Sequence, residues 1–287
     1  RLGAWVDLQG HDLTAVRGLR IIKTGGETHS RARNTLDARS STVTIGGDLV
    51  LTEPGVSETN TNGRVGIIGN ADTVVNLVGS FSADRVSYPS ANLSSATINL
   101  TGGSETSPNT FEAAADPDHD VGSHTFGVGI LNVGTASEPA HIQLVNDYLN
   151  DNDRGTSGRT KDGEVLLAGT LNINADSVLD LNGLGVKIGS DTLHIEPTGL
   201  LDLNTGLDLG AGDPIDAFIG MGDQTVDWAS YADMVVDSSN PLALFAPTTD
   251  GQGNTIWEVS QIVPEPSSLV LVTLLAWSLF RRRRSME

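Results

Sequence analysis

Two polar segments carry the side chains best suited to metal chemistry. The first places three carboxylates and two imidazoles close together in sequence: Asp116, Asp118, His119, Asp120 and His124. Both kinds of group are ligands of protein-bound cations. No recognised ligand spacing is met, however, and Pro117 limits how closely these side chains can converge. We therefore interpret the segment as a solvated acidic loop.

The second segment resembles a calcium-binding loop in composition only. It contains Asp147, Asn150, Asp151, Asn152 and Asp153, followed by Gly155. A calcium loop of the EF-hand type needs its glycine at a fixed position and a bidentate glutamate at its end. Here the glycine is displaced and no such glutamate follows. We expect a loop, with no metal, no cofactor and no catalytic residue in either segment.

A pair of repeated aspartates, Asp180 and Asp202, is the third candidate. Two carboxylates on adjacent strands repel each other unless a cation lies between them. Some β-helix enzymes cleave acidic polysaccharides with a calcium-bound carboxylate cluster and a basic residue, and Lys187 lies close in sequence. A polysaccharide lyase-like enzyme is therefore the alternative function. The chain lacks the Gly-x-Ser-x-Gly, His-Glu-x-x-His, phosphate-loop and dinucleotide motifs, so we expect no enzyme.

These aspartates belong to a repeat that predicts the fold. Residues 170–174 are echoed at 192–196, and residues 178–182 at 200–204, both at an offset of 22. Weaker copies of a five-residue pattern, aliphatic–polar–aliphatic–any–Gly, lie at 6–10, 75–79, 98–102 and 179–183. The segments 43–47 and 65–69 are also separated by 22 residues. Alternating aliphatic and polar residues followed by Gly, Asn or Asp indicate short strands and turns.

Such short strands bury a continuous core only when they are stacked. The predicted fold is all-β: a parallel β-solenoid, or β-helix, of about 22-residue rungs. Its inward side chains would be Leu171, Ile173, Leu179 and Leu181, stacked on Leu193, Ile195, Leu201 and Leu203. The polar residues between them, including Asn172, His194, Asp180 and Asp202, would face outward. The competing fold is an antiparallel sandwich or barrel, which also has short, regularly spaced strands.

The repeat divides the chain into three parts. We predict an irregular solenoid at 1–210, a capping region at 211–262 and a C-terminal tail at 263–287. Segments 104–123 and 147–163 are predicted loops within the solenoid. In the cap, a short helix at 226–236 would place Trp228, Tyr231 and Val235 on one face, and residues 255–259 would form the last strand.

The tail holds an uncharged apolar run at 267–280, followed by Arg281, Arg282, Arg283 and Arg284. A helix over this run would extend about 21 Å, and a full membrane span takes about 20 residues. We expect a single C-terminal transmembrane helix whose arginines reach the headgroups on the cytoplasmic side. The other interpretations are a plain C-terminal anchor and a buried core helix.

The tail resembles the PEP-CTERM sorting signal of Gram-negative bacteria. The resemblance covers residues 263–287: Pro264, Glu265 and Pro266 form the sorting motif, and the arginine cluster forms the membrane stop. It implies that the protein is exported, held in the inner membrane and processed by an exosortase. It also implies a link to exopolysaccharide. Ectodomains of this kind vary widely, so the resemblance implies no activity for residues 1–262.

Composition limits the partners and the chemistry of the chain. The net charge of −19 should repel nucleic acid, so divalent cations or neutral polysaccharide are the more plausible partners. The chain has no cysteine, which excludes disulfides and thiol chemistry. No secretion signal occurs near the start of the given sequence, and we expect one upstream of Arg1.

We therefore expect an exported structural or adhesive protein of the cell surface or extracellular matrix. An extracellular carbohydrate-active enzyme on a β-helix scaffold is the alternative function. A degenerate gene fragment is the third possibility.

Overall fold

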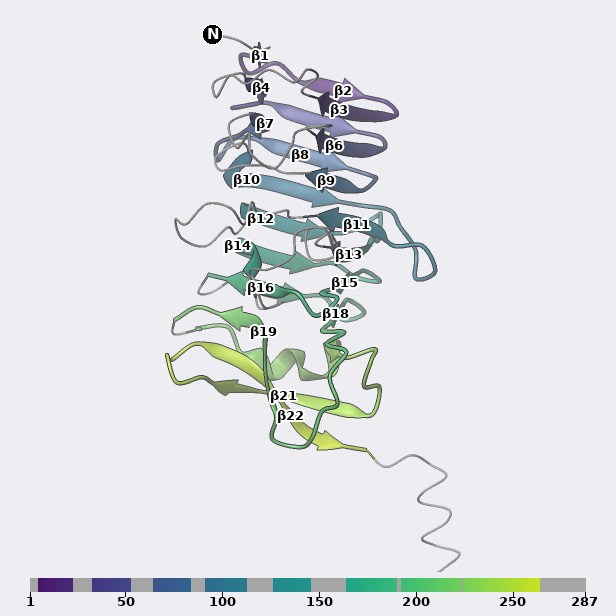
Figure 1. Cartoon of the computed structure of the whole chain (residues 1–287), viewed down its shortest axis with the longest axis vertical. Coiled ribbons are helices and arrows are strands. Elements are labelled where there is room, and N and C mark those ends of the chain that lie inside the picture. The colour runs from purple at the N-terminus through teal and green to yellow at the C-terminus, as the bar shows by residue number, and fades with distance from the viewer. Residues whose placement is uncertain are drawn as a thin grey trace, which may run out of the picture.

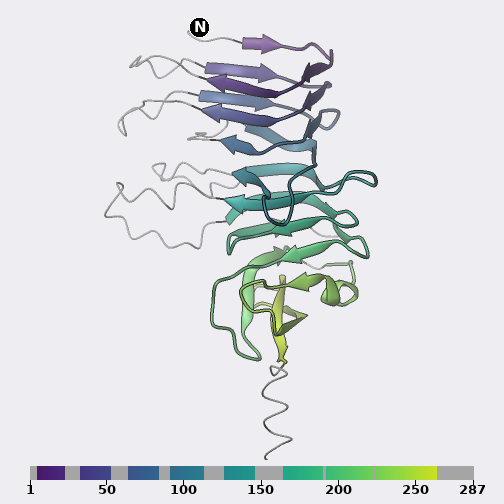
Figure 2. The same ribbon diagram turned by 90° about the vertical axis from the view of Figure 1, so that its right-hand side faces the viewer.

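The chain winds around one long axis as an elongated stack of β-strands, shown from two sides in Figures 1 and 2. This computed structural model describes residues 5–22, 33–52, 64–83, 91–112, 126–145, 164–189, 192–222 and 224–263. Each turn of the winding, here called a rung, passes through three strand positions in the same order. Strands at one position pair with those in the rungs above and below, so each position forms one face of the stack.

The described strands sort into these positions by their partners. The first position holds β1 (Trp5–Asp7), β4 (Arg33–Asp37), β7 (Arg64–Ile68), the beginnings of β10 (Ala91–Leu100), β12 (Phe126–Val133) and β14 (Glu164–Ile173), then β16 (Gly185–Ile188) and β19 (Pro214–Gly220). The second position holds β2 (Leu13–Ala15), β5 (Thr42–Ile45), β8 (Val74–Leu77), the ends of β10, β12 and β14, and β17 (Leu193–Ile195). The third position holds β3 (Gly18–Ile22), β6 (Asp48–Thr52), β9 (Phe81–Ala83), β11 (Asn109–Glu112), β13 (His141–Val145), β15 (Val178–Asp180), β18 (Leu200–Asp202) and β20 (Val235–Val236).

The predicted strand register is confirmed where the repeat is clearest. Leu171 pairs with Leu193, and Ile173 pairs with Ile195, in parallel strands. At the third position, the 178–180 strand pairs in parallel with 200–202, which places Asp180 beside Asp202. Parallel pairing excludes the antiparallel sandwich or barrel for this part of the chain.

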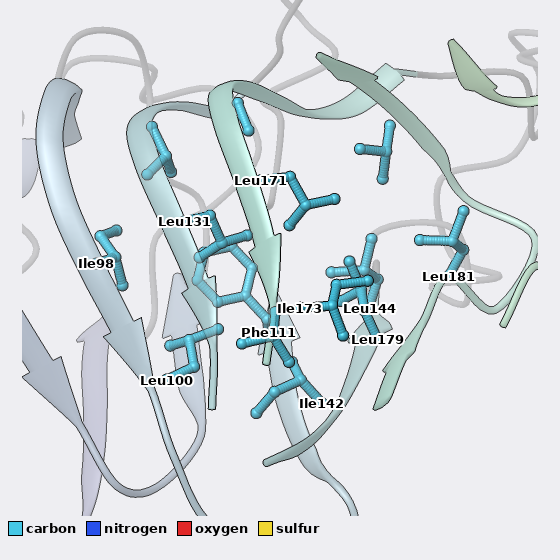
Figure 3. Close-up of a cluster of buried hydrophobic side chains, with 14 of the residues drawn as sticks. Ile98, Leu100, Phe111, Leu131, Ile142, Leu144, Leu171, Ile173, Leu179 and Leu181 are labelled. Atoms are coloured by element: carbon cyan, nitrogen blue, oxygen red, sulfur yellow. The ribbon is translucent and has the colours of Figure 1, made fainter. Parts of the chain in front are cut away.

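One apolar core fills the space between the three faces. Leu171, Ile173, Leu179 and Leu181 are fully buried, and Figure 3 shows them beside labelled core residues of neighbouring rungs. Their predicted partners are buried as well: Leu193, Ile195, Leu201 and Leu203. Burying one leucine or isoleucine side chain contributes about 1.5–3 kcal/mol, so the aliphatic core is the main stabilising term of the stack.

The spacing of the rungs is less regular than the repeat predicted. The paired strands β1 and β4 lie further apart in sequence than the predicted offset, and the paired strands β12 and β14 lie further apart still. The relation proposed between 43–47 and 65–69 is wrong, because Val43 pairs with Val75. The connections between successive strands of the stack are here called corners. Closing a longer loop costs little additional free energy, so strand pairing tolerates corners of different length.

The predicted loop at 104–123 contains a strand. Within it, β11 occupies the third position, and Phe111 stacks on Phe81 of β9 with ring centroids 4.9 Å apart. Residues 113–125 and 146–163, which include most of the two predicted loops, lie outside the described residues.

Parallel stacking continues beyond residue 210 before the end of the stack is closed. Phe218 of β19 pairs with Val186, and Val235 of β20 pairs with Leu201. The 3-10 helix η2 (Trp228–Met234) and the antiparallel strands β21 (Ala243–Thr249) and β22 (Thr255–Ile262) then cover this end. The Trp228 ring lies 5.5 Å from Phe218 and 5.3 Å from Trp257, centroid to centroid. β22 confirms the predicted last strand.

The predicted fold class needs one correction. No helix in the described part of the chain is long and apolar enough to cross a membrane. The one helix described there, η2, has seven residues, or about 14 Å of 3-10 helix, against an apolar bilayer thickness of about 30 Å. No described element therefore corresponds to the expected C-terminal transmembrane helix. Its segment at 267–280 lies outside the described residues.

Candidate functional site

A continuous polar column runs along the outside of the second-position face. Its residues pair from rung to rung in this order: Thr14, Thr44, Asn76, Asn99, Asn132, Asn172 and His194. We call this set the asparagine column. Its neighbours in sequence, such as Ile98 and Leu100, point into the core, and strand alternation therefore places the column residues outside.

The four asparagines form a hydrogen-bonded ladder. Nδ2 of Asn99 donates to Oδ1 of Asn76 at 2.7 Å, and Nδ2 of Asn132 donates to Oδ1 of Asn99 at 2.6 Å. Asn172 continues the ladder by donating to Oδ1 of Asn132 at 2.7 Å. An asparagine amide has two donor hydrogens and two acceptor lone pairs. In the ladder, Asn99 and Asn132 each donate one hydrogen bond and accept one. These two bonds fix the plane of each amide. One donor hydrogen and one lone pair of each amide are not used by the ladder.

A second outward column lies two residues before the first on the same strands. It consists of Thr42, Val74, Thr97, Ile130 and Thr170. Ile130 is 38% exposed, and the other four side chains are half-buried. These five residues and the column members from Thr44 to Asn172 together form what we call the neutral face. None of these side chains is charged, although the chain as a whole carries −19.

The third-position face differs in that it carries carboxylates. Asp180 and Asp202 are directly paired on β15 and β18, as the sequence repeat predicted. Asp180 accepts hydrogen bonds from Gln143 Nε2 at 2.6 Å and from Asn204 Nδ2 at 3.0 Å. Asp202 accepts from the backbone N–H of Ser238 at 2.9 Å. Donors of the protein itself therefore bond to both carboxylate oxygens of Asp180 and to Oδ1 of Asp202.

Both aspartates also cap the turn that follows their own strand. The backbone N–H of Asn182 donates to Asp180 at 2.8 Å, and that of Asn204 donates to Asp202 at 3.1 Å. Asn182 and Asn204 adopt left-handed backbone conformations, with φ of 50° and 41°, which asparagine tolerates better than most residues. The repeated aspartate is thus explained by turn geometry.

Burial raises the pKa of Asp202, and the nearby charge of Asp180 raises it further, while hydrogen bonds from Ser238 and Asn204 act in the opposite direction. The charged form of Asp202 is therefore less favourable in the folded state than in the unfolded chain. A raised folded-state pKa contributes stability at low pH, and this contribution is lost as pH rises through that pKa. At neutral pH the Asp202 carboxylate opposes folding.

Asp202→Asn is expected to stabilise the protein at pH 7 by about 0.5–1 kcal/mol, after allowance for solvent screening. The amide oxygen can still accept from Ser238 and Asn204, while the charge facing Asp180 is removed. Urea unfolding should show a gain that disappears below pH 3.8, the ordinary pKa of the group. Asp180→Asn is the matched control. It should destabilise, because its new NH₂ group would face a donor, Nε2 of Gln143. A loss of stability in Asp202→Asn at pH 7 would contradict the assignment.

Lys187, considered above as a base beside the aspartates, lies on another face. It is in β16 at the first strand position and pairs with Leu167 and Ile219, whereas Asp180 is at the third position. The structure therefore does not bring the aspartate pair and this lysine together on one face. In the described part of the chain, no group of three or more His, Asp or Glu side chains is placed to hold a metal ion.

The C-terminal end of the asparagine column carries a small polar cluster. His194 Nε2 lies 3.0 Å from Glu196 Oε1, and the Tyr231 hydroxyl lies 3.5 Å from His194 Nδ1. The tyrosine ring meets the imidazole edge to face at 6.5 Å. The His194 and Glu196 side chains are 55% and 43% exposed, so the contact between them contributes about 0–1 kcal/mol. We regard the cluster as the polar end of the column.

A buried carboxylate at the cap was not anticipated from the sequence. Asp237 is 1% exposed and accepts from Thr205 Oγ1 at 2.6 Å, from the Ser239 N–H at 2.9 Å and from the Asn240 N–H at 3.2 Å. Burial alone would raise its pKa, but hydrogen bonds from Ser239, Thr205 and Asn240 outweigh burial and hold it below the ordinary value. Asp237 thereby ties the cap to the corner after β18.

The other predicted site residues lie outside the described residues. They are the sorting motif Pro264, Glu265 and Pro266, the arginines Arg281, Arg282, Arg283 and Arg284, and both acidic loops considered for metal binding. The neutral face was missed, although its signal is present in the sequence. An aliphatic residue followed by asparagine recurs in three triplets: Thr97-Ile98-Asn99, Ile130-Leu131-Asn132 and Thr170-Leu171-Asn172. The first residue is threonine in two of them and Ile130 in the other. The triplets are separated by unequal sequence offsets.

The chain matches no protein-family model, and no curated protein or solved structure was found to be similar to it.

Proposed function

We propose that this chain is an exported structural or adhesive protein of the cell surface or extracellular matrix. One observation carries the sorting part of the proposal: Pro264, Glu265 and Pro266 precede an apolar run and four arginines in the order of a PEP-CTERM signal. In this proposal, an exosortase at the inner membrane recognises the Pro-Glu-Pro motif and processes the tail.

The geometry of the described residues supports a structural rather than a catalytic role. Asp180 and Asp202, the best candidates for acid–base chemistry, cap their own turns and accept hydrogen bonds from Gln143, Asn204 and Ser238. A catalytic carboxylate needs an accessible position next to a substrate atom. The long outward faces of the stack are better suited to contact with an extended partner.

Tail processing is the test of the sorting proposal. The full chain, produced behind a working secretion signal, should lose mass from its C-terminus in a host with an exosortase and keep it in a host without one. Glu265→Ala should abolish the loss, because it alters the centre of the sorting motif. Glu105→Ala, at an exposed glutamate in the stack, is the control and should be processed normally. Equal intact masses in both hosts would reject the proposal.

A further inference from the structure

We propose that the neutral face binds a linear, uncharged polysaccharide along the axis of the stack. The inference deepens the adhesive role proposed above by naming the class of partner. It depends on the described face and not on the sorting tail.

The charge distribution selects an uncharged partner. The chain carries −19, yet no outward side chain of the neutral face between Thr42 and Asn172 is charged. Anionic polymers would be repelled by the protein as a whole, and cationic ones would find no carboxylate on this face. Hydroxyl and amide groups instead match the hydroxyls of a neutral sugar, which both donate and accept.

The regular spacing of the face selects a linear polymer. Strands of successive rungs lie about 4.8 Å apart, so Asn76, Asn99, Asn132 and Asn172 repeat at that interval in a straight line. A linear polysaccharide also presents its hydroxyls at a fixed repeat along one axis. Many weak contacts on one chain reinforce each other, because each contact after the first is made within the same complex.

The ladder prepares the face for binding. Its amide–amide hydrogen bonds at 2.6–2.7 Å hold Asn99 and Asn132 in one orientation before any ligand arrives. Fixing a side chain in advance lowers the entropic cost of binding. Beside the ladder, Val74 and Ile130 offer apolar surface to the C–H groups of a sugar ring. At the end of the column, the Tyr231 ring lies next to exposed His194.

The experiment measures co-sedimentation of the purified full chain with three insoluble neutral polysaccharides: cellulose, chitin and retrograded amylose. We expect binding to at least one of them and none to calcium-crosslinked alginate, which is anionic. Ile130→Glu puts a charge in the middle of the neutral face and should weaken binding at least about tenfold. Leu207→Glu, at a 60% exposed leucine near the cap, is the matched control and should bind like the unmodified chain.

Circular dichroism of both variants separates loss of binding from loss of the fold. Thr97→Glu is a second variant on the same face, in case Ile130→Glu does not fold. The proposal is overturned if no neutral polysaccharide is bound, if alginate is bound as well as the neutral polymers, or if folded Ile130→Glu and Thr97→Glu bind normally. None of these outcomes affects tail processing, so failure here is distinguishable from failure of the sorting proposal.

Discussion

Leu203→Asp is expected to destabilise the protein by about 4 kcal/mol or more, which is a large share of the stability of a typical domain. Leu203 is fully buried, and its backbone N–H donates to the carbonyl of Val236 in the next rung at 2.8 Å. A carboxylate at this position would face the aliphatic core without a partner. Urea unfolding followed by circular dichroism should show a much lower midpoint.

Leu207→Asp is the control for this substitution. Leu207 lies close to Leu203 in sequence, but its side chain is 60% exposed, so the same chemical change should alter stability by no more than about 0.5 kcal/mol. If the two variants unfolded at the same urea concentration, the inward assignment of Leu203, and with it the rung register, would be wrong.

Asp237→Ala should cost about 2–4 kcal/mol. The substitution leaves the Thr205 hydroxyl and the N–H groups of Ser239 and Asn240 without their buried acceptor. Because these groups join the corner after β18 to the cap, we expect the cap to loosen first. Relative to the unmodified chain, the substitution should accelerate hydrogen exchange more in β21 and β22 than in β14.

The effect of Asp237→Ala should depend on pH in a defined direction. A lowered folded-state pKa contributes stability above the ordinary pKa, and this contribution is lost as pH falls through the folded-state value. The difference between Asp237→Ala and the unmodified chain should therefore shrink below pH 3.8, the ordinary pKa of the group. A constant difference from pH 7 to pH 3 would contradict the role given to the charge.

The sequence predicted which side chains point into the core better than it predicted the length of each rung. Leu171, Ile173, Leu179 and Leu181 were assigned correctly because aliphatic residues alternating with polar ones have few structural alternatives. The length of each rung could not be predicted in the same way. Corners carry no aliphatic pattern, so the segment at 43–47 was matched with 65–69 by its spacing instead of with its true partner strand β8.

The candidate site was harder to predict for a related reason. Successive asparagines of the ladder are separated by sequence offsets of 23, 33 and 40, and only pairing brings them into one line. Asp180 and Asp202 were placed correctly on adjacent strands, but their role as turn caps was missed, although the Asp-Leu-Asn sequence at both sites fits an aspartate that accepts from the backbone N–H two residues on. Asp237 was missed because its hydrogen-bond partner Thr205 is distant in sequence, at an offset of 32.

Distances between spin labels along the asparagine column test the central claim most directly, namely that this column is a straight track across the rungs. The chain has no cysteine, so labels attach only at introduced ones. Six strand steps separate Thr14 from His194, and five separate Thr44 from His194. At about 4.8 Å per step, pulsed electron paramagnetic resonance should give about 29 Å and 24 Å between the backbone positions, apart from the label arms. Distances that do not decrease by about one strand spacing from the first pair to the second would contradict the account.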